Sequence, residues 1–171
     1  MNTQAPSRIT LKTLMASLES DDGTVRQNAR DALVAFSGPA VPYLIKALGN
    51  SGSIQLRWEA AKALGAIRNP KSIKVLVPAL TDKDSDVAWL AAEALIAFGE
   101  DAWFPLLRAL IKDGPNSAQL RQGAHHVFSK QQADGFDDLL AALEKDLEPG
   151  KAEESAPVIA YKILKQMKAK T

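Results

Sequence analysis

Short apolar pairs return along this chain at nearly constant spacing. Each pair is Ala-Leu or Ser-Leu, and successive pairs are 30 to 33 residues apart. The leucines that end the pairs are Leu18, Leu48, Leu80, Leu110 and Leu143. A period in this range predicts one supersecondary unit stacked on itself, as in a solenoid.

The leucine of each pair ends a longer apolar stripe. Another Leu lies four residues before it, and a large apolar residue lies three residues before that Leu. These large residues are Leu11, Val41, Ile73, Trp103 and Phe136. Spacings of three and four place such side chains on one face of an α-helix. We therefore expect the first helix of each repeat, the A helix, to bury this stripe, Trp103 included.

A second helix, the B helix, follows each A helix and has its own pattern of apolar, small, small, Leu and apolar residues. In the third repeat this pattern reads Val87, Ala91, Ala94, Leu95 and Phe98. It begins at Val25 in the first repeat, and it is looser in the fourth repeat, where Gln131 takes an apolar place. Because these positions cover roughly a third of the helix circumference, they predict a buried stripe in which alanine permits close helix packing.

Glycine, proline and N-cap residues mark the ends of the predicted helices. Gly and Pro separate B helices from the next A helix. The N-cap positions are Asp22, Ser53 or Ser51, Asp84 or Ser85, and Ser117. Pro78 lies inside the third A helix and is expected to bend it. No segment alternates with period two, so we predict no strands. The helices predicted are 9–19, 24–37, 39–49, 53–68, 71–81, 85–98, 100–112, 117–131, 135–147 and 156–168.

The sequence thus predicts an all-α fold, a short right-handed α-α superhelix of about five helix pairs. Residues 1–171 are expected to form a single domain. Its repeats are approximately 9–37, 39–68, 71–98, 100–131 and 135–168.

A more specific motif opens the B helices. Residues 22–33 read D-G-T-V-R-Q-N-A-R-D-A-L, residues 56–64 repeat it without the Asp, and residues 86–95 repeat it without the Arg. This D-x-x-V-R-x-x-A-x-x-A-L pattern resembles that of HEAT repeats of the short bacterial type. It is similar to the HEAT-like repeats of phycobilin lyases, over about residues 9–169. The resemblance implies a fold that many activities share, so it identifies no single function.

Composition narrows the class of protein. The chain is 46% hydrophobic and 24% charged, as ordinary soluble globular proteins are. It has no cysteine, which excludes disulfides and thiolate chemistry. No signal peptide or membrane-spanning run is recognised, so we expect a cytoplasmic protein. The net charge of +1 disfavours strong nonspecific nucleic-acid binding, although the first half of the chain is basic and the second half acidic.

Two tryptophans share one position in successive B helices. Trp58 and Trp89 each lie two residues after the first apolar residue, about 170° from the centre of the buried stripe. In HEAT repeats the B helices line the concave surface, so the resemblance implies that both indoles and Ile96 face it. Exposed aromatic patches mark interfaces. The alternative is that the two rings only pack against neighbouring B helices and their Lys and Arg stems.

Arginine also recurs at one position of the B helices. Arg26, Arg57 and Arg121 are equivalent, and Arg30 lies one turn after the first of them. One interpretation is a basic ladder for phosphate or acidic peptide. The other, which the HEAT resemblance implies and which we favour, is an Asp–Arg ladder that joins adjacent repeats.

Metal and calcium sites are disfavoured. His125 and His126 are the only histidines, and neighbours on a helix point about 100° apart, so they do not share a metal easily. Residues 82–86 imitate a calcium loop, but Val87 stands where the loop needs Gly. Lysines in the last helix are read as a solvated end cap. We expect no catalytic residue, metal or cofactor, and we expect His125 to line the groove.

We therefore predict a non-enzymatic scaffold that binds another protein or peptide on its concave B-helix face. The binding residues expected are Trp58, Trp89, Ile96, Arg26, Arg30, Arg57 and His125. One alternative is a subunit like those of phycobilin lyases, which would hold a tetrapyrrole and its acceptor protein, with Arg pairing the propionates. Another is nucleic-acid binding in a basic and aromatic concave groove.

Overall fold

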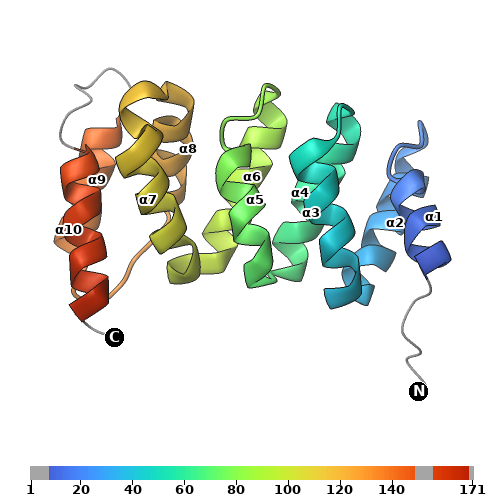
Figure 1. Ribbon diagram of the computed structural model, residues 1–171, viewed down its shortest axis with the longest axis horizontal. Helices are drawn as coiled ribbons and strands as arrows, with labels where there is room; N and C mark the ends of the chain where they lie inside the picture. The colour runs from blue at the N-terminus through green and yellow to red at the C-terminus, as the bar shows by residue number, and fades with distance from the viewer. Residues whose placement is uncertain (1–7, 149–155, 170–171) are drawn as a thin grey trace.

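The computed structural model describes residues 8–148 and 156–169, and these residues form helices, turns and loops without a strand (Figure 1). The α-helices agree with the predicted ranges to within a few residues. They are α1 (Arg8–Ser17), α2 (Gly23–Phe36), α3 (Val41–Asn50), α4 (Ile54–Ile67), α5 (Ile73–Ala79), α6 (Ser85–Phe98), α7 (Trp103–Asp113), α8 (Ala118–Phe128), α9 (Asp137–Leu147) and α10 (Ala156–Ala169). Short 3-10 turns precede α3, α5, α7 and α8.

Helices α2, α4, α6 and α8 begin at side-chain caps, and of the alternatives predicted the caps are Ser53 rather than Ser51 and Asp84 rather than Ser85. Asp22 accepts a hydrogen bond from the Thr24 amide at 2.7 Å, and Asp84 accepts one from the Val87 amide at 3.0 Å. The two remaining caps are Ser53 at the start of α4 and Ser117 at the start of α8. Each cap satisfies a backbone N–H that has no partner inside the helix, which fixes where the helix starts.

Each of the first three B helices ends in a residue with positive φ, which turns the chain toward the next A helix. Gly99 takes this conformation at φ 59°, where glycine carries no steric penalty. Ser37 and Arg68 hold the equivalent place at φ 53° and 51°. The left-handed region costs a non-glycine residue roughly 1–2 kcal/mol, so packing of the neighbouring helices holds these turns.

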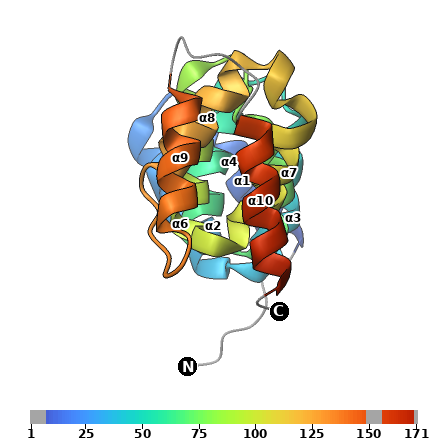
Figure 2. The same ribbon diagram turned by 90° about the vertical axis from the view of Figure 1, so that its left-hand side faces the viewer.

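The helices form two layers. The A layer holds α1, α3, α5, α7 and α10, and the B layer holds α2, α4, α6, α8 and α9 (Figures 1 and 2). The first four pairs follow the predicted order of A and B helices. The fifth pair is inverted, because α9 packs against α8 and α10 packs against α7. The prediction that residues 135–147 continue the row of A helices is therefore wrong.

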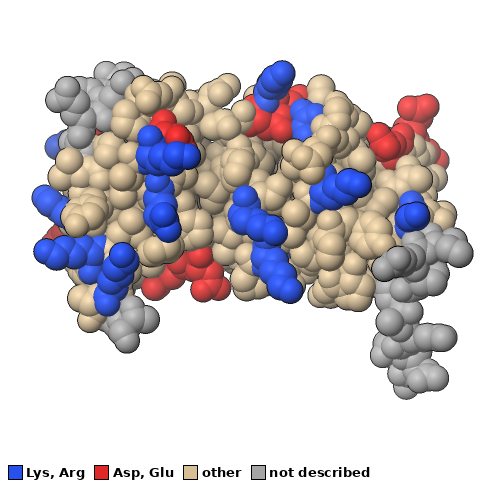
Figure 3. Space-filling view, viewed as in Figure 1, with Lys and Arg blue, Asp and Glu red and all other residues tan. Residues whose placement is uncertain are grey.

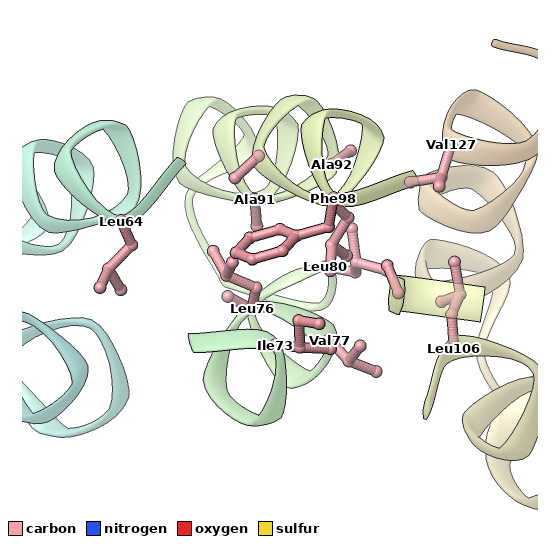
Figure 4. Packing of buried hydrophobic residues seen from close by; sticks show 14 of the residues in the cluster. Leu64, Ile73, Leu76, Val77, Leu80, Ala91, Ala92, Phe98, Leu106 and Val127 are labelled. Atoms are coloured by element: carbon pink, nitrogen blue, oxygen red, sulfur yellow. The ribbon is translucent and has the colours of Figure 1, made fainter. Parts of the chain in front are cut away.

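The core lies between the layers and is continuous from repeat to repeat. Trp103 is completely buried, as predicted, and its ring meets Phe128 and Phe136 edge to face at centroid distances of 6.1 and 5.6 Å. Figure 4 shows the middle of the core, where Leu64 approaches α5 and α6 from one side and Leu106 from the other. Each repeat thus completes the core of its neighbours, as in other solenoids.

Small residues bring neighbouring B helices close together. A Cβ built on Gly65 of α4 would lie 2.9 Å from the Cβ of Ala94 on α6, closer than side chains approach. Ala61 and Ala92, which hold equivalent positions on α4 and α6, are also buried. The B layer is therefore tightly packed, and its outer surface is a continuous face rather than a set of separate helices.

Two details differ from the sequence-based expectation. Pro78 does not bend a long helix, because α5 ends one residue later, at Ala79. Pro78 has no N–H for the helical bond to the Lys74 carbonyl, and the amides of residues 80–82 donate to carbonyls three residues back, as in tight turns. Val25 was expected in the core, but 40% of it is exposed. It lies on the side of α2 where no earlier repeat covers the helix among the described residues.

No single helix in the described ranges is long and apolar enough to cross a bilayer. The pair formed by α2 and residues 38–50 reaches that length and composition together, but it is bent by 114° at its junction.

Candidate functional site

The outer surface of the B layer carries one strongly exposed tryptophan. The side chain of Trp89 on α6 is 55% exposed. Trp58, at the equivalent place on α4, is half-buried, and the Lys62 ammonium lies 4.3 Å from the centre of its ring. The two tryptophans therefore differ: Lys62 covers Trp58 through a cation–π contact, whereas the face of Trp89 is available.

Trp89 is flanked by an acid–imidazole pair. His126 of α8 lies 2.6 Å from Glu93 of α6, measured from Nε2 to Oε1. The imidazole also lies beside the indole of Trp89, with 6.5 Å between the ring centres and 35° between the planes. An aromatic anchor with a polar rim on two neighbouring helices is typical of a protein-binding surface.

The histidine beside Trp89 is His126, and not His125 as predicted from the sequence. Lys62, Glu93 and His126 are equivalent positions in three successive B helices, each four residues after the tryptophan position. His125 instead corresponds to Ala92, which is buried against the neighbouring B helix. This register was readable in the sequence, but the looser pattern of the fourth repeat obscured it.

Ile96 and Gln131 lie near the C-terminal end of this surface. Ile96 is half-buried and packs against the core. The Gln131 amide donates to the Ile96 carbonyl at 3.4 Å and its oxygen accepts from the Trp103 indole N–H at 3.3 Å. Gln131 therefore replaces an apolar residue in the B pattern because it links α6 to the buried Trp103.

Glu59 gathers two of the predicted binding arginines. It is 2% exposed on α4, and its two carboxylate oxygens lie 2.6 Å from Arg30 and 3.4 Å from Arg26. Both arginines belong to α2, so the cluster joins the first repeat to the second. The charges of Arg26 and Arg30 are thus paired with Glu59 inside the B layer.

Arg57 makes the corresponding link from the second repeat to the third. Its Nε and Nη2 donate to the two oxygens of Asp82 at 2.7 and 2.8 Å, and its Nη1 donates to the Ser51 carbonyl at 3.0 Å. Arg26 donates in the same way to the Ser20 carbonyl at 2.7 Å. The bidentate contact is an Asp–Arg link between two repeats, whereas the carbonyl contacts fix each arginine within its own repeat. Together they leave no free arginine fork for a phosphate at Arg57.

The Arg57–Asp82 pair shifts both pKa values. The hydrogen bond from Arg57 to Asp82 raises the pKa of the arginine despite its partial burial. Burial by itself raises the pKa of Asp82, but hydrogen bonds from Arg57 and from the Asp84 amide, with the nearby positive charges, hold that pKa below its ordinary value. The ionised form of Asp82 is therefore the form that stabilises the fold.

We expect this pair to contribute to acid unfolding. A carboxylate with a depressed pKa stabilises the fold fully above its unfolded value of about 3.9, and this contribution is lost as the pH falls through the folded value. Asp82→Asn should lower the free energy of unfolding by about 2 kcal/mol at pH 7 and reduce its loss below pH 4. Urea unfolding from pH 7 to 3 measures both, with exposed Asp86→Asn as the control. Equal acid slopes for Asp82→Asn and the unmodified chain would contradict the assignment.

Two open clefts border the B helices. One of about 280 Å³ lies among α2, α4 and the start of α6, and it is lined by Arg26, Ile54, Gln55, Trp58, Asp84 and Asp86. The other, of about 580 Å³, lies at the loops before α4 and α6 and includes the Arg57–Asp82 pair in its wall. In the part of the chain that the structure describes, no group of three His, Asp or Glu side chains is placed to hold a metal. The acidic run 82–86 serves instead in the Arg57 pair and in the cap of α6.

Stacked helix pairs with inter-repeat ion pairs define an α-solenoid. The chain belongs to the HEAT repeat family, whose model matches residues 41–128, slightly more than half of the sequence. A curated relative is the phycocyanobilin lyase subunit alpha of Picosynechococcus sp., which is 33% identical over 82 residues. That match covers 48% of this chain and 31% of the relative, so it spans less than a third of that protein.

Proposed function

We propose that this chain is a non-enzymatic scaffold that binds another protein or peptide on the outer surface of its B layer. HEAT repeats suit protein interaction, and the B layer offers a continuous face with an aromatic anchor. In this proposal the solenoid supplies a rigid support, and the affinity comes from a few residues on α6 and α8.

The observation that carries the proposal is the exposure of Trp89. A tryptophan that is 55% exposed leaves a large apolar ring in water, and its burial by a partner is favourable. Glu93 and His126 beside it supply charge and hydrogen-bonding groups for the rim. Trp58 and Ile96, both half-buried, would extend the apolar contact on either side.

The predicted arginines take a different part in this proposal. Arg26, Arg30 and Arg57 set the spacing of the repeats through Glu59 and Asp82, and so they position the surface. His125 is half-buried on α8 and would contribute at the edge. The partner would thus contact chiefly α6 and its neighbours, and not a line of free cations.

We expect Trp89→Ala to weaken binding of the partner at least tenfold, because truncation of a central aromatic anchor commonly costs 2 kcal/mol or about thirtyfold in Kd. The partner would be identified by quantitative pull-down from native lysate and then titrated in purified form. Trp58→Ala should have the smaller effect, since Lys62 already covers that ring.

Tyr161→Ala is the matched control, because Tyr161 is also an exposed aromatic residue, at 62%, but lies on α10 in the opposite layer. The expected result is a partner that Trp89→Ala loses and Tyr161→Ala retains, with unchanged helicity and melting for both. Equal binding by all three proteins would refute the assignment of the B-layer surface.

A second candidate is a bilin-binding subunit, which the match to a phycocyanobilin lyase subunit favours. The geometry supports it less well, because Arg26 and Arg57, which would pair propionates, are engaged with Glu59 and Asp82. The cleft beside Trp58, at about 280 Å³, is also at the lower limit for a small-molecule site. Titration of a free bilin with the chain separates the candidates: a shifted visible spectrum favours this one, and an unchanged spectrum removes it.

A further inference from the structure

The A layer is basic along its whole length. Its helices carry lysine or arginine in every repeat, and the acidic residue among them is Asp113, at the end of α7. The basic side chains that the structure describes there are Lys12, Lys46, Lys74, Arg108, Lys112, Lys162, Lys165 and Lys168. Figure 3 shows this face, with blue side chains spread from one end to the other and most of the red at its upper and lower edges.

These cations are exposed and almost entirely without acidic partners. All eight are exposed, and the ion pair that they form within the described ranges is Lys112 with Asp113 at 4.0 Å. Arg108 lies over the ring of Phe104, 5.7 Å from its centre. Arg26, Arg30 and Arg57 of the B layer are the opposite case, because Glu59 and Asp82 neutralise them. The A layer is therefore a face on which cations occur in every helix with almost no carboxylate among them.

The inverted fifth pair creates this segregation. Because α10 packs beside α7, it adds Lys162, Lys165 and Lys168 to the A layer. In the regular order α9 would lie there, with Asp137, Asp138, Glu144, Lys145 and Asp146. The inversion thus places a helix with three lysines in the A layer instead of a helix with four carboxylates and one lysine.

Exposed apolar side chains lie among the cations at the same end. Val158 and Tyr161 on α10 are 54% and 62% exposed, and Phe104 on α7 is 37% exposed. Lys162 and Lys165 lie four residues after Val158 and Tyr161, so they share the outward stripe of α10. Aromatic rings next to lysine stems suit a boundary between a charged and an apolar medium.

We infer that the A layer docks onto the surface of an anionic phospholipid bilayer. Seven of the eight cations are lysines, which act as point charges and suit a diffuse anionic surface, whereas nucleic-acid recognition makes more use of the arginine fork. The cations are spread over five helices and not along one groove, so they match a broad fluid surface better than a strand of phosphates with fixed spacing. The contact is peripheral, with lysines at the headgroups and the rings of Tyr161 and Phe104 at the interface.

Vesicle flotation with the full chain tests this inference. The probes are vesicles of phosphatidylcholine mixed with phosphatidylglycerol, and vesicles of phosphatidylcholine alone. The test variant is Lys46→Gln, Lys74→Gln, Lys165→Gln, which removes one cation from each of three A-layer helices. The matched control is Lys83→Gln, Lys130→Gln, Lys145→Gln, which removes the same charge from exposed lysines of the B layer and its loops.

We expect the unmodified chain to float with the anionic vesicles at low salt, and to dissociate at high salt. The A-layer variant should bind about a hundredfold more weakly, since each lysine near an anionic surface contributes close to a factor of five. The control variant and Trp89→Ala should bind within about threefold of the unmodified chain, so this result is separate from the test of the B-layer surface.

Three outcomes would overturn the inference. They are no binding to anionic vesicles at low salt, equal losses in the A-layer and control variants, and tighter binding to a short duplex than to the vesicles. The last outcome would assign the basic face to nucleic acid.

Discussion

Trp103→Ala is expected to lower the free energy of unfolding by about 3–5 kcal/mol. Trp103 is completely buried and packs edge to face against Phe128 and Phe136, so its removal leaves a cavity at the junction of α7, α8 and the turn before α9. The Gln131 side-chain oxygen also loses its donor, the indole N–H. Urea unfolding followed by circular dichroism measures the change.

Trp89→Ala is the matched control for that measurement, because it deletes the same side chain from an exposed position. Its expected cost is below about 1 kcal/mol, as for surface substitutions. Similar losses in the two variants would contradict the division of the tryptophans into a core residue and a surface residue. That division underlies the functional proposal.

Glu59→Gln is expected to cost about 3 kcal/mol, because it leaves Arg26 without its counter-charge and leaves Arg30 with only the exposed Asp31, at 3.9 Å. The loss lies at the lower end for buried pairs, since the two arginine side chains are 24% and 16% exposed. Thermal and urea unfolding at neutral pH measure it.

The control for Glu59 is Glu19→Gln, an exposed carboxylate, which should change stability by less than about 0.5 kcal/mol. Because Glu59 joins the first two repeats, its loss should also increase amide exchange in α1 and α2 more than in α7. Uniform exchange along the solenoid, or no loss of stability, would contradict a ladder that joins repeat to repeat.

Local patterns in the sequence predict most of the helices and their buried faces. The stripe through Trp103 and the caps at Asp22 and Ser117 depend on neighbours within a few residues, so spacing alone predicts them correctly. Partners across repeats are different: Arg57 reaches Asp82 and Arg30 reaches Glu59, which lie 25 and 29 residues away. A sequence shows the charges but not which side chain neutralises them.

The inverted fifth pair was not predictable from periodicity. The apolar stripe of α9 or of α10 could be buried in either layer, because each of these helices covers the end of the core with one face. What decides between the layers is packing against α7 and α8, which no single-sequence pattern contains. The sequence shows a basic first half and an acidic second half. The structure instead gathers basic side chains from both halves on the A layer.

Site-specific photocrosslinking of the purified partner tests most directly whether the partner binds the B layer. A photoreactive residue at Gln122 reports on the B layer, because Gln122 is exposed one turn before His126 on α8. The same residue at Val158 reports on the A layer. If the partner binds the B layer, we expect a crosslink from position 122 and none from position 158. A crosslink from position 158 alone would contradict this expectation and place the partner on the A layer.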